Sequence, residues 1–356
     1  MGNDNYRETL PSALPTSAFS LSIVLFFKLN WRTIAPFPPS HNQFLGKTRP
    51  NTRFLTRLLL VVSAGLHAEK SIMLVPTHCT GNNMDITQYF SKNLLTGKTV
   101  CVTGGGSGIN LGIAKNFAAV GAKVAICGRT PEKLEAAAEE IREHGTEVFT
   151  QAADVRDYEA LESFFRNTVE TLGSVDVLVC GAAGNFIAPA EKLSANGFKT
   201  VVDIDLLGTF NASRAAFEHL QASRGSLIFI SAGQSFIPYP FQAHAGAAKA
   251  GIDNLAKNLA LEWGPYGIRC NTIAPGPIAD TEGMRRLGNA QTNKKFAALI
   301  PLKRFGTVDE IGQLAVFLAS PLAAYITGTV VVADGGQNLL GSGILQSLWS
   351  EAMTTQ

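Results

Sequence analysis

The chain has 356 residues, of which 46% are hydrophobic and 34 are glycine, and its net charge is +2. This length allows one large domain or two small ones, and the composition suits an α/β core with many turns. The charge is uneven, because residues 1–83 carry a net charge of +5 and residues 84–356 a net charge of −3. A mildly acidic body argues against a nucleic acid as the main partner.

Residues 1–83 differ in character from the rest of the chain. Their apolar runs, 23–27 and 58–62, are too short to cross a bilayer, which takes about 20 residues. We therefore predict no integral membrane segment. An acid-poor stretch with Ser and Arg is compatible with a targeting segment, whereas Met84 offers a natural start shortly before the first strand. We predict a poorly structured extension or a misassigned start over 1–83, followed by a single domain over 84–356.

The five cysteines show no spacing that is typical of a metal site or a disulfide framework. Three of them, Cys101, Cys127 and Cys180, fall in apolar runs. We interpret them as small buried hydrophobic residues in a reducing compartment and expect no metal site.

From residue 95 onwards, strand-like and helix-like segments alternate. The apolar runs that predict strands are 99–103, 123–127, 147–150, 175–180, 226–230, 268–274 and 329–333. A helical pattern covers 110–120, and Thr130-Pro131 is a typical start of a second helix. This alternation predicts an α/β fold: a Rossmann-type, doubly wound parallel sheet of about seven strands with helices on both faces. Ligands of such sheets bind at the carboxyl ends of the strands.

A glycine-rich turn joins the first predicted strand to its helix. Glycines allow a sharp turn and a close approach to a pyrophosphate, which the helix N-terminus then attracts. Asn110 stands where a third glycine is usual, so its side chain is either tolerated beside the phosphates or donates a hydrogen bond to them. The candidate cofactor ligands here are Gly104, Gly105, Ser107, Gly108, Ile109 and Asn110.

The second predicted strand ends in Cys127-Gly128-Arg129-Thr130. Enzymes that use NAD place an acidic residue here to bind the ribose 2′-hydroxyl. Arg129 and Thr130 suit a 2′-phosphate instead, so we predict NADP(H) as the cofactor. Asp154, after the third strand, is placed to accept a hydrogen bond from the adenine amino group.

Together these motifs resemble the short-chain dehydrogenase/reductase family over residues 95–340. The further matching motifs are Asp154-Val155, Cys180-Gly181-Ala182-Ala183-Gly184, Lys249, Ala274-Pro275-Gly276-Pro277 and Asp334-Gly335-Gly336. By this resemblance Lys249, Pro275, Gly276, Ile278 and Thr281 are expected to contact the cofactor.

Within that family the chain is similar to the peroxisomal-type 2,4-dienoyl-CoA reductases. The segments that carry this similarity are Ala182 to Phe186, Asp203-Ile204-Asp205, His244 to Lys249, and Pro275 to Ile278 with Thr281-Glu282-Gly283. The resemblance implies NADPH-dependent reduction of a 2,4-dienoyl-CoA to a 3-enoyl-CoA, in the degradation of unsaturated fatty acids. It also implies contacts with coenzyme A from Arg156, Phe186, Ser194, Asn196 and Arg286, and residues 280–299 have a length that suits a substrate lid.

The residues that usually protonate a carbonyl oxygen in this family are missing. Ala245 stands in place of the tyrosine four residues before Lys249, and Ala232 in place of the serine. Gln234 stands where the mitochondrial-type dienoyl-CoA reductases have a tyrosine. Asp205 and Lys249 remain, so we predict that these two are catalytic, with Asp205 supplying a proton and Lys249 favouring negative charge on an intermediate. We take the nearby Tyr239 to be a packed loop residue.

Two other interpretations remain open. One is a carbonyl or hydroxy reductase of the same fold with its acid recruited elsewhere, and the other is an NADP-binding pseudoenzyme with a regulatory role. The apolar character of residues 249–263 is consistent with a homo-oligomer, expected to be a tetramer. The chain ends in Met353-Thr354-Thr355-Gln356 rather than a Ser-Lys-Leu-type signal, so we expect a cytoplasmic location, with the mitochondrion or the peroxisome as alternatives.

Overall fold

The computed structural model describes residues 85–287 and 290–342. The predicted extension over 1–83 and the last fourteen residues lie outside the described part. Seven strands form one sheet, as predicted. Their bounds are β1 (Thr99–Thr103), β2 (Lys123–Gly128), β3 (Val148–Ala152), β4 (Val177–Cys180), β5 (Ser226–Ile230), β6 (Arg269–Pro275) and β7 (Val330–Ala333).

All neighbouring strands of this sheet are parallel, in the order β3-β2-β1-β4-β5-β6-β7. The chain winds outward in one direction from β1 to β3 and in the other from β4 to β7. The winding direction therefore changes between β1 and β4, which is where open α/β sheets form their ligand crevice.

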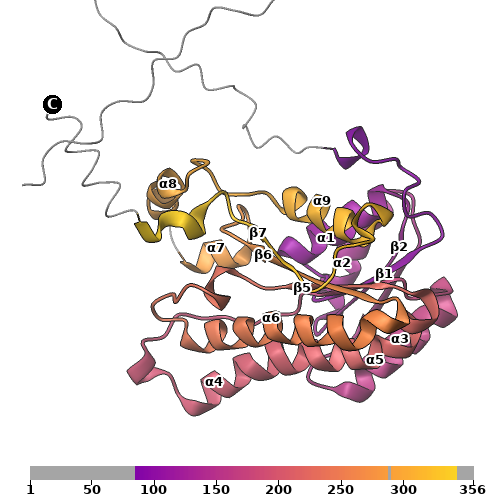
Figure 1. Cartoon of the computed structure of the whole chain (residues 1–356), viewed down its shortest axis with the longest axis horizontal. Coiled ribbons are helices and arrows are strands. Elements are labelled where there is room, and N and C mark those ends of the chain that lie inside the picture. The colour runs from indigo at the N-terminus through magenta and orange to yellow at the C-terminus, as the bar shows by residue number, and fades with distance from the viewer. Residues whose placement is uncertain (1–84, 288–289, 343–356) are drawn as a thin grey trace, which may run out of the picture. The chain divides into compact units, whose positions relative to one another are not determined.

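Nine helices surround the sheet within the described residues. Their bounds are α1 (Gly108–Ala119), α2 (Pro131–Arg142), α3 (Tyr158–Leu172), α4 (Ala195–Val202), α5 (Gly208–Ser223), α6 (Ala243–Trp263), α7 (Glu282–Leu287), α8 (Ala290–Leu299) and α9 (Val308–Ala319). Figure 1 shows α1, α2 and α9 on one face of the sheet and α3, α5 and α6 on the other. Residues 280–299, interpreted as a lid, contain α7 and α8.

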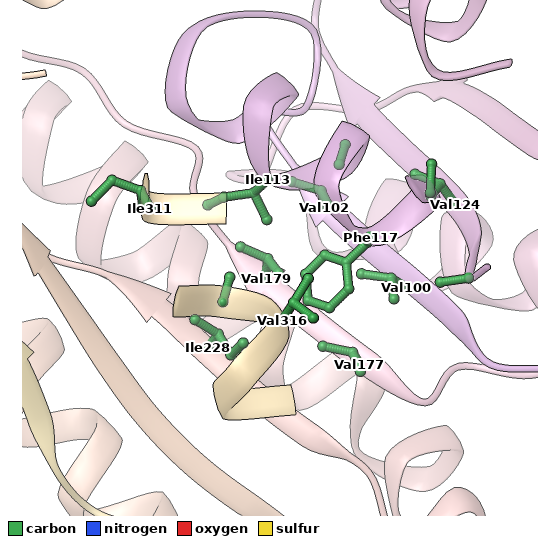
Figure 2. Close-up of a cluster of buried hydrophobic side chains, with 14 of the residues drawn as sticks. Val100, Val102, Ile113, Phe117, Val124, Val177, Val179, Ile228, Ile311 and Val316 are labelled. Atoms are coloured by element: carbon green, nitrogen blue, oxygen red, sulfur yellow. The ribbon is translucent and has the colours of Figure 1, made fainter. Parts of the chain in front are cut away.

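Two hydrophobic clusters fill the spaces between the sheet and its helices. On one face, Phe117 of α1 and Val316 of α9 pack over Val100, Val179 and their neighbours on the sheet (Figure 2). On the other face, Cys101, Cys127 and Cys180 lie in the second cluster, with residues of α3, α5 and α6. Alternate residues of a strand thus point to opposite faces of the sheet. The prediction that these three cysteines are buried is confirmed.

Residues 303–310 form a polar start to α9. Thr307 and Glu310 make a capping box, in which each side chain bonds the other's backbone N–H. Arg304 donates to both carboxylate oxygens of Glu310, at 2.9 and 2.5 Å. These bonds hold the pKa of Glu310 below its ordinary value.

In the part of the chain that the structure describes, no helix is long and apolar enough to cross a membrane.

Candidate active site

A cavity of about 540 Å³ opens at the carboxyl ends of the strands. Segments at the carboxyl ends of all seven strands line it, with Gln337 contributed after β7, as expected for a parallel sheet. These lining segments include residues 106–110 after β1, 128–130 after β2, 153–155 after β3, 181–183 after β4, 230–234 after β5 and 275–278 after β6.

Most of the predicted cofactor ligands lie on the wall of this cavity. They are Gly104, Ser107, Gly108, Ile109, Asn110, Arg129, Thr130, Asp154, Lys249, Pro275, Gly276, Ile278 and Thr281. Gly105 is absent from the lining. A Cβ atom on Gly105 would lie 2.6 Å from Cγ2 of Ile126, so this glycine allows the turn after β1 to pack closely against the β2 side chain. Its predicted contact with the cofactor stays a prediction without support from this geometry.

The side chain of Asn110 makes its hydrogen bonds within the protein. Its Nδ2 donates to the carbonyl oxygens of Gly104, at 3.3 Å, and of Gly181, at 2.8 Å. Both amide hydrogens are therefore used, so of the two alternatives for Asn110 this conformation contradicts a hydrogen bond to the phosphates and leaves a side chain that is tolerated beside them. Asn110 instead joins the loop after β1 to the loop after β4, across the point where the winding direction changes. Residue 181 must be glycine here, because a Cβ atom would overlap the Asn110 carboxamide.

Cationic side chains lie in the part of the cavity that follows the end of β2, called here the β2 corner. Arg129 and Thr130 are exposed, and Thr130 precedes α2 without using its hydroxyl as a helix cap. Lys133, one turn into α2, also lines the cavity. Neither Arg129 nor Lys133 forms an ion pair with a residue of 85–287 or 290–342. Sequence reasoning missed Lys133, although its spacing from Arg129 on a helix start was visible.

Asp154 and Arg156 pair with each other. The Arg156 guanidinium donates to both oxygens of Asp154, at 3.0 and 2.6 Å, and its backbone N–H also donates to Oδ1. This Arg156 contact is the main cause that lowers the pKa of Asp154. Asp154 lines the cavity but Arg156 does not. The structure therefore places Arg156 as the partner of Asp154, and its predicted contact with coenzyme A stays a prediction.

Asp205 and Lys249 form a buried ion pair at the base of the cavity. Oδ2 of Asp205 lies 3.2 Å from Nζ of Lys249. Oδ1 of Asp205 accepts from the backbone N–H of Gly184 at 2.7 Å, and Nζ of Lys249 donates to the carbonyl of Ile230 at 3.0 Å. Asp205 lies in a π-helical turn, Asp203–Leu207, between α4 and α5. Such turns are frequent at functional sites because they shift side chains out of the α-helical register.

Three carboxamides also belong to the wall of this cavity. Asn185, Gln234 and Gln242, called here the amide cluster, all line the cavity. Ala232 and Ala245 line it too. Neither Ala232 nor Ala245 therefore offers a hydroxyl group to a substrate in this cavity. Tyr239, interpreted as a packed loop residue, is half-buried and also lines the cavity, where its hydroxyl accepts from Gln337 at 2.9 Å.

Four of the five predicted substrate residues, Arg156, Phe186, Ser194 and Asn196, are not among the described residues that line this cavity. Phe186 is 42% exposed and its ring packs edge-on against His244, with 4.4 Å between ring centroids. Ser194 caps α4 by accepting from the backbone N–H of Gly197. Asn196 lies in α4, and the side chain of Arg286 lies outside the described residues. These contacts with coenzyme A stay predictions.

This architecture defines an enzyme that binds a nicotinamide dinucleotide, because the glycine turn, helix α1 and the cavity meet where the winding direction changes. Comparison with known proteins agrees. Residues 104–338 match the family model described as enoyl-(acyl carrier protein) reductase. The chain belongs to the short-chain dehydrogenase/reductase family, and it is an oxidoreductase.

The matches to individual relatives extend over nearly the whole length of those relatives. A peroxisomal 2,4-dienoyl-CoA reductase of Saccharomyces cerevisiae, named as (3E)-enoyl-CoA-producing, is 45% identical over 77% of this chain and 97% of its own. A probable 2,4-dienoyl-CoA reductase of Bacillus subtilis, named as (2E)-enoyl-CoA-producing, is 42% identical over 67% of this chain and 96% of its own. The crystal structure of a short chain dehydrogenase from Bacillus anthracis is 43% identical, with a TM-score of 0.62 over 68% of this chain and 96% of its own.

Proposed function

We propose that this chain reduces 2,4-dienoyl-CoA thioesters with NADPH to 3-enoyl-CoA, in the degradation of unsaturated fatty acids, through one domain over residues 84–356. The observation that carries this proposal is the pairing of Asp205 with Lys249 beneath a cavity wall that has alanine at 232 and 245. A carbonyl reductase needs an acid beside the carbonyl oxygen, whereas a dienoyl thioester takes its proton on carbon.

The residues present fit a nicotinamide dinucleotide with a 2′-phosphate. Gly104 has a φ of +70°, and a Cβ atom there would lie 2.9 Å from Cα of Ala182, so only glycine leaves room at this turn. Arg129 and Lys133 supply cations for the 2′-phosphate at the β2 corner. Bound here, the cofactor supplies a hydride to carbon 5 of the substrate.

The rest of the reaction falls to the chain's own residues. After reduction at carbon 5, negative charge lies on a dienolate that extends to the thioester oxygen, and the new double bond joins carbons 3 and 4. Asp205, directly or through a water, delivers a proton to the α carbon, while Lys249 stabilises negative charge nearby. One dienoyl-CoA, one NADPH and one proton thus give one 3-enoyl-CoA and one NADP⁺.

The names of the relatives support this chemistry and raise one distinction. Both are 2,4-dienoyl-CoA reductases by name, yet one is named for a (3E)-product and the other for a (2E)-product. Protonation at the α carbon gives the first of these, which is the product that we propose. The peroxisome in the name of the yeast relative favours that location over the cytoplasm and the mitochondrion for this chain.

The proposed assembly is a homo-oligomer, expected to be a tetramer. Leu261 of α6 is 79% exposed, and Phe210 of α5 is 45% exposed, although both helices are otherwise packed on the sheet. Exposed large apolar side chains on neighbouring helices are typical of surfaces that are covered by another copy.

A direct assay tests the proposed function. The full-length chain is incubated with NADPH and 2,4-hexadienoyl-CoA, and the loss of both absorbances is followed. We expect equal loss of the two compounds, and no turnover of simple ketones. Consumption of ketones, with the dienoyl-CoA left unchanged, would favour an ordinary carbonyl reductase.

A further inference from the structure

The amide cluster is held together through one oxygen atom. Oε1 of Gln242 accepts from Nδ2 of Asn185 at 2.8 Å and from Nε2 of Gln234 at 3.3 Å. The three side chains come from two segments: Asn185 follows β4, whereas Gln234 and Gln242 lie in the connection between β5 and α6. Gln242 is therefore fixed in place by two neighbours rather than free to rotate.

These two bonds leave the amide nitrogen of Gln242 as a donor. A carboxamide oxygen has two lone pairs, and both are now used. Nε2 of Gln242 has no acceptor among the described residues, although Gln242 lines the cavity. If the carboxamide groups were rotated by 180°, the –NH2 group of Asn185 would be buried without a partner at the place where its unpaired Oδ1 now lies. Unpaired donors are rarer in protein interiors than unpaired acceptors, so the present orientation is favoured.

The position of Gln242 suits negative charge. It is the residue directly before α6 (Ala243–Trp263), so the positive end of a 21-residue helix lies beside it. Ala245 lies one turn further along and lines the same cavity. The donor is thus found next to the position where carbonyl reductases of this family keep their tyrosine.

A carboxamide differs from a tyrosine in one respect that matters here. Its N–H group donates a hydrogen bond but does not release the proton, whereas a phenol can do both. An oxygen held by amides therefore keeps its negative charge, and the proton has to be accepted elsewhere in the molecule. This is the requirement of a reaction that ends in protonation of carbon.

We propose that Gln242 is a catalytic residue whose Nε2–H donates to the thioester oxygen as negative charge develops on it. This inference rests on the proposed function and deepens it. Asn185 and Gln234 are positioning residues, which hold the Gln242 oxygen so that its nitrogen faces the substrate. Lys249 and Asp205 line the same cavity and keep the roles proposed above.

Two variants separate this role from a structural one. Gln242→Glu keeps an oxygen for both bonds within the amide cluster but removes the N–H donor. Gln242→Met removes the donor and both of these bonds without adding charge. We expect kcat to fall by about 100-fold in each, the usual scale for one oxyanion donor. The dissociation constant for NADPH, measured by fluorescence, is expected to change by less than about twofold. Gln151→Glu, a partly buried glutamine on β3 that bonds Asn167, is the matched control.

The kinetic isotope effect with deuterated NADPH provides the second readout. Weaker stabilisation of the oxyanion slows hydride transfer, so the primary isotope effect on kcat should rise in both Gln242 variants. A kcat within about threefold of the parent enzyme, or an unchanged isotope effect, would overturn the role of Gln242 while leaving the proposed function intact. If the parent enzyme turns over no dienoyl-CoA, the proposed function fails, and the inference fails with it.

Discussion

Asp205 and Lys249 are buried side by side, with 3.2 Å between Oδ2 and Nζ, although 44 positions separate them in the chain. Their side chains are 1% and 9% exposed. The backbone of Gly184 holds the carboxylate and the carbonyl of Ile230 holds the ammonium, so both groups are oriented by the ends of neighbouring strands. A buried pair of this kind is costly to desolvate, and its position beneath the cavity favours a role in chemistry over one in stability.

The carboxylate of Asp205 should be essential for turnover. Asp205→Asn keeps the size of the side chain but supplies no carboxyl group for the proton transfer. We expect kcat to fall by about 100-fold or more, with the NADPH dissociation constant nearly unchanged. Asp203 lies in the same π-helical turn and forms a more exposed ion pair with Lys199 of α4. Asp203→Asn, which breaks that pair, is the control and should retain activity. Full turnover by Asp205→Asn would remove Asp205 from the mechanism.

Arg129 should determine the choice between the two nicotinamide cofactors. Arg129→Gln removes a cation that can form two bonds to a 2′-phosphate, so KM for NADPH should rise by about 10-fold or more, while KM for NADH should not rise. Lys133→Gln should act in the same direction with a smaller effect. Arg142→Gln, at the far end of α2 and paired with Glu135 and Glu139, serves as the control. Equal changes for both cofactors would contradict a contact with the 2′-phosphate.

The contact between Asn110 and Gly181 should appear as coupling in a double-mutant cycle. Gly181→Ala forces the Asn110 carboxamide to move, and we expect it to lower the free energy of unfolding by about 1–3 kcal/mol, as overpacking does. In an Asn110→Gly background the same alanine should cost much less. Denaturant unfolding of the four proteins measures the coupling, and additive effects would show that the two residues do not interact.

Acid should remove the stabilisation that Glu310 supplies at the start of α9. The Arg304 contact lowers the folded-state pKa of Glu310 below its ordinary value of 4.5. Its contribution is therefore complete above that ordinary value and is lost as the pH falls through the lowered, folded-state value. Glu310→Gln should reduce the free energy of unfolding by about 1 kcal/mol near neutral pH, the scale of a lost helix cap, and this difference should shrink in acid. A difference that is independent of pH would contradict the assignment.

The fold and the cofactor end could be predicted from the sequence because their signals are local. Apolar runs gave all seven strands, with ends that differ from the observed ones by no more than two residues, as for β4, predicted over 175–180 and observed at Val177–Cys180. The glycine turn after β1 was visible for the same reason. A parallel sheet then fixes where the ligand binds, since all its strands end at one edge.

The contacts that could not be predicted join segments far apart in the chain. The role of Asn110 was left open between two alternatives, because nothing in the local sequence reveals that the carbonyl of Gly181 lies within reach. The amide cluster was missed because Gln234 was considered only as the replacement of a tyrosine and Gln242 was not considered at all. The pairing of Arg156 with Asp154 is, in contrast, a local contact, and it was missed because Arg156 was considered only as a ligand of coenzyme A.

The position of the added proton tests the central claim most directly. Full-length enzyme, NADPH and 2,4-hexadienoyl-CoA are combined in deuterium oxide, and the product is examined by nuclear magnetic resonance. We predict a 3-enoyl-CoA with one deuterium on the α carbon and an unlabelled carbon 5. A 2-enoyl-CoA with deuterium on carbon 4, or no reduction of the diene, would contradict the account.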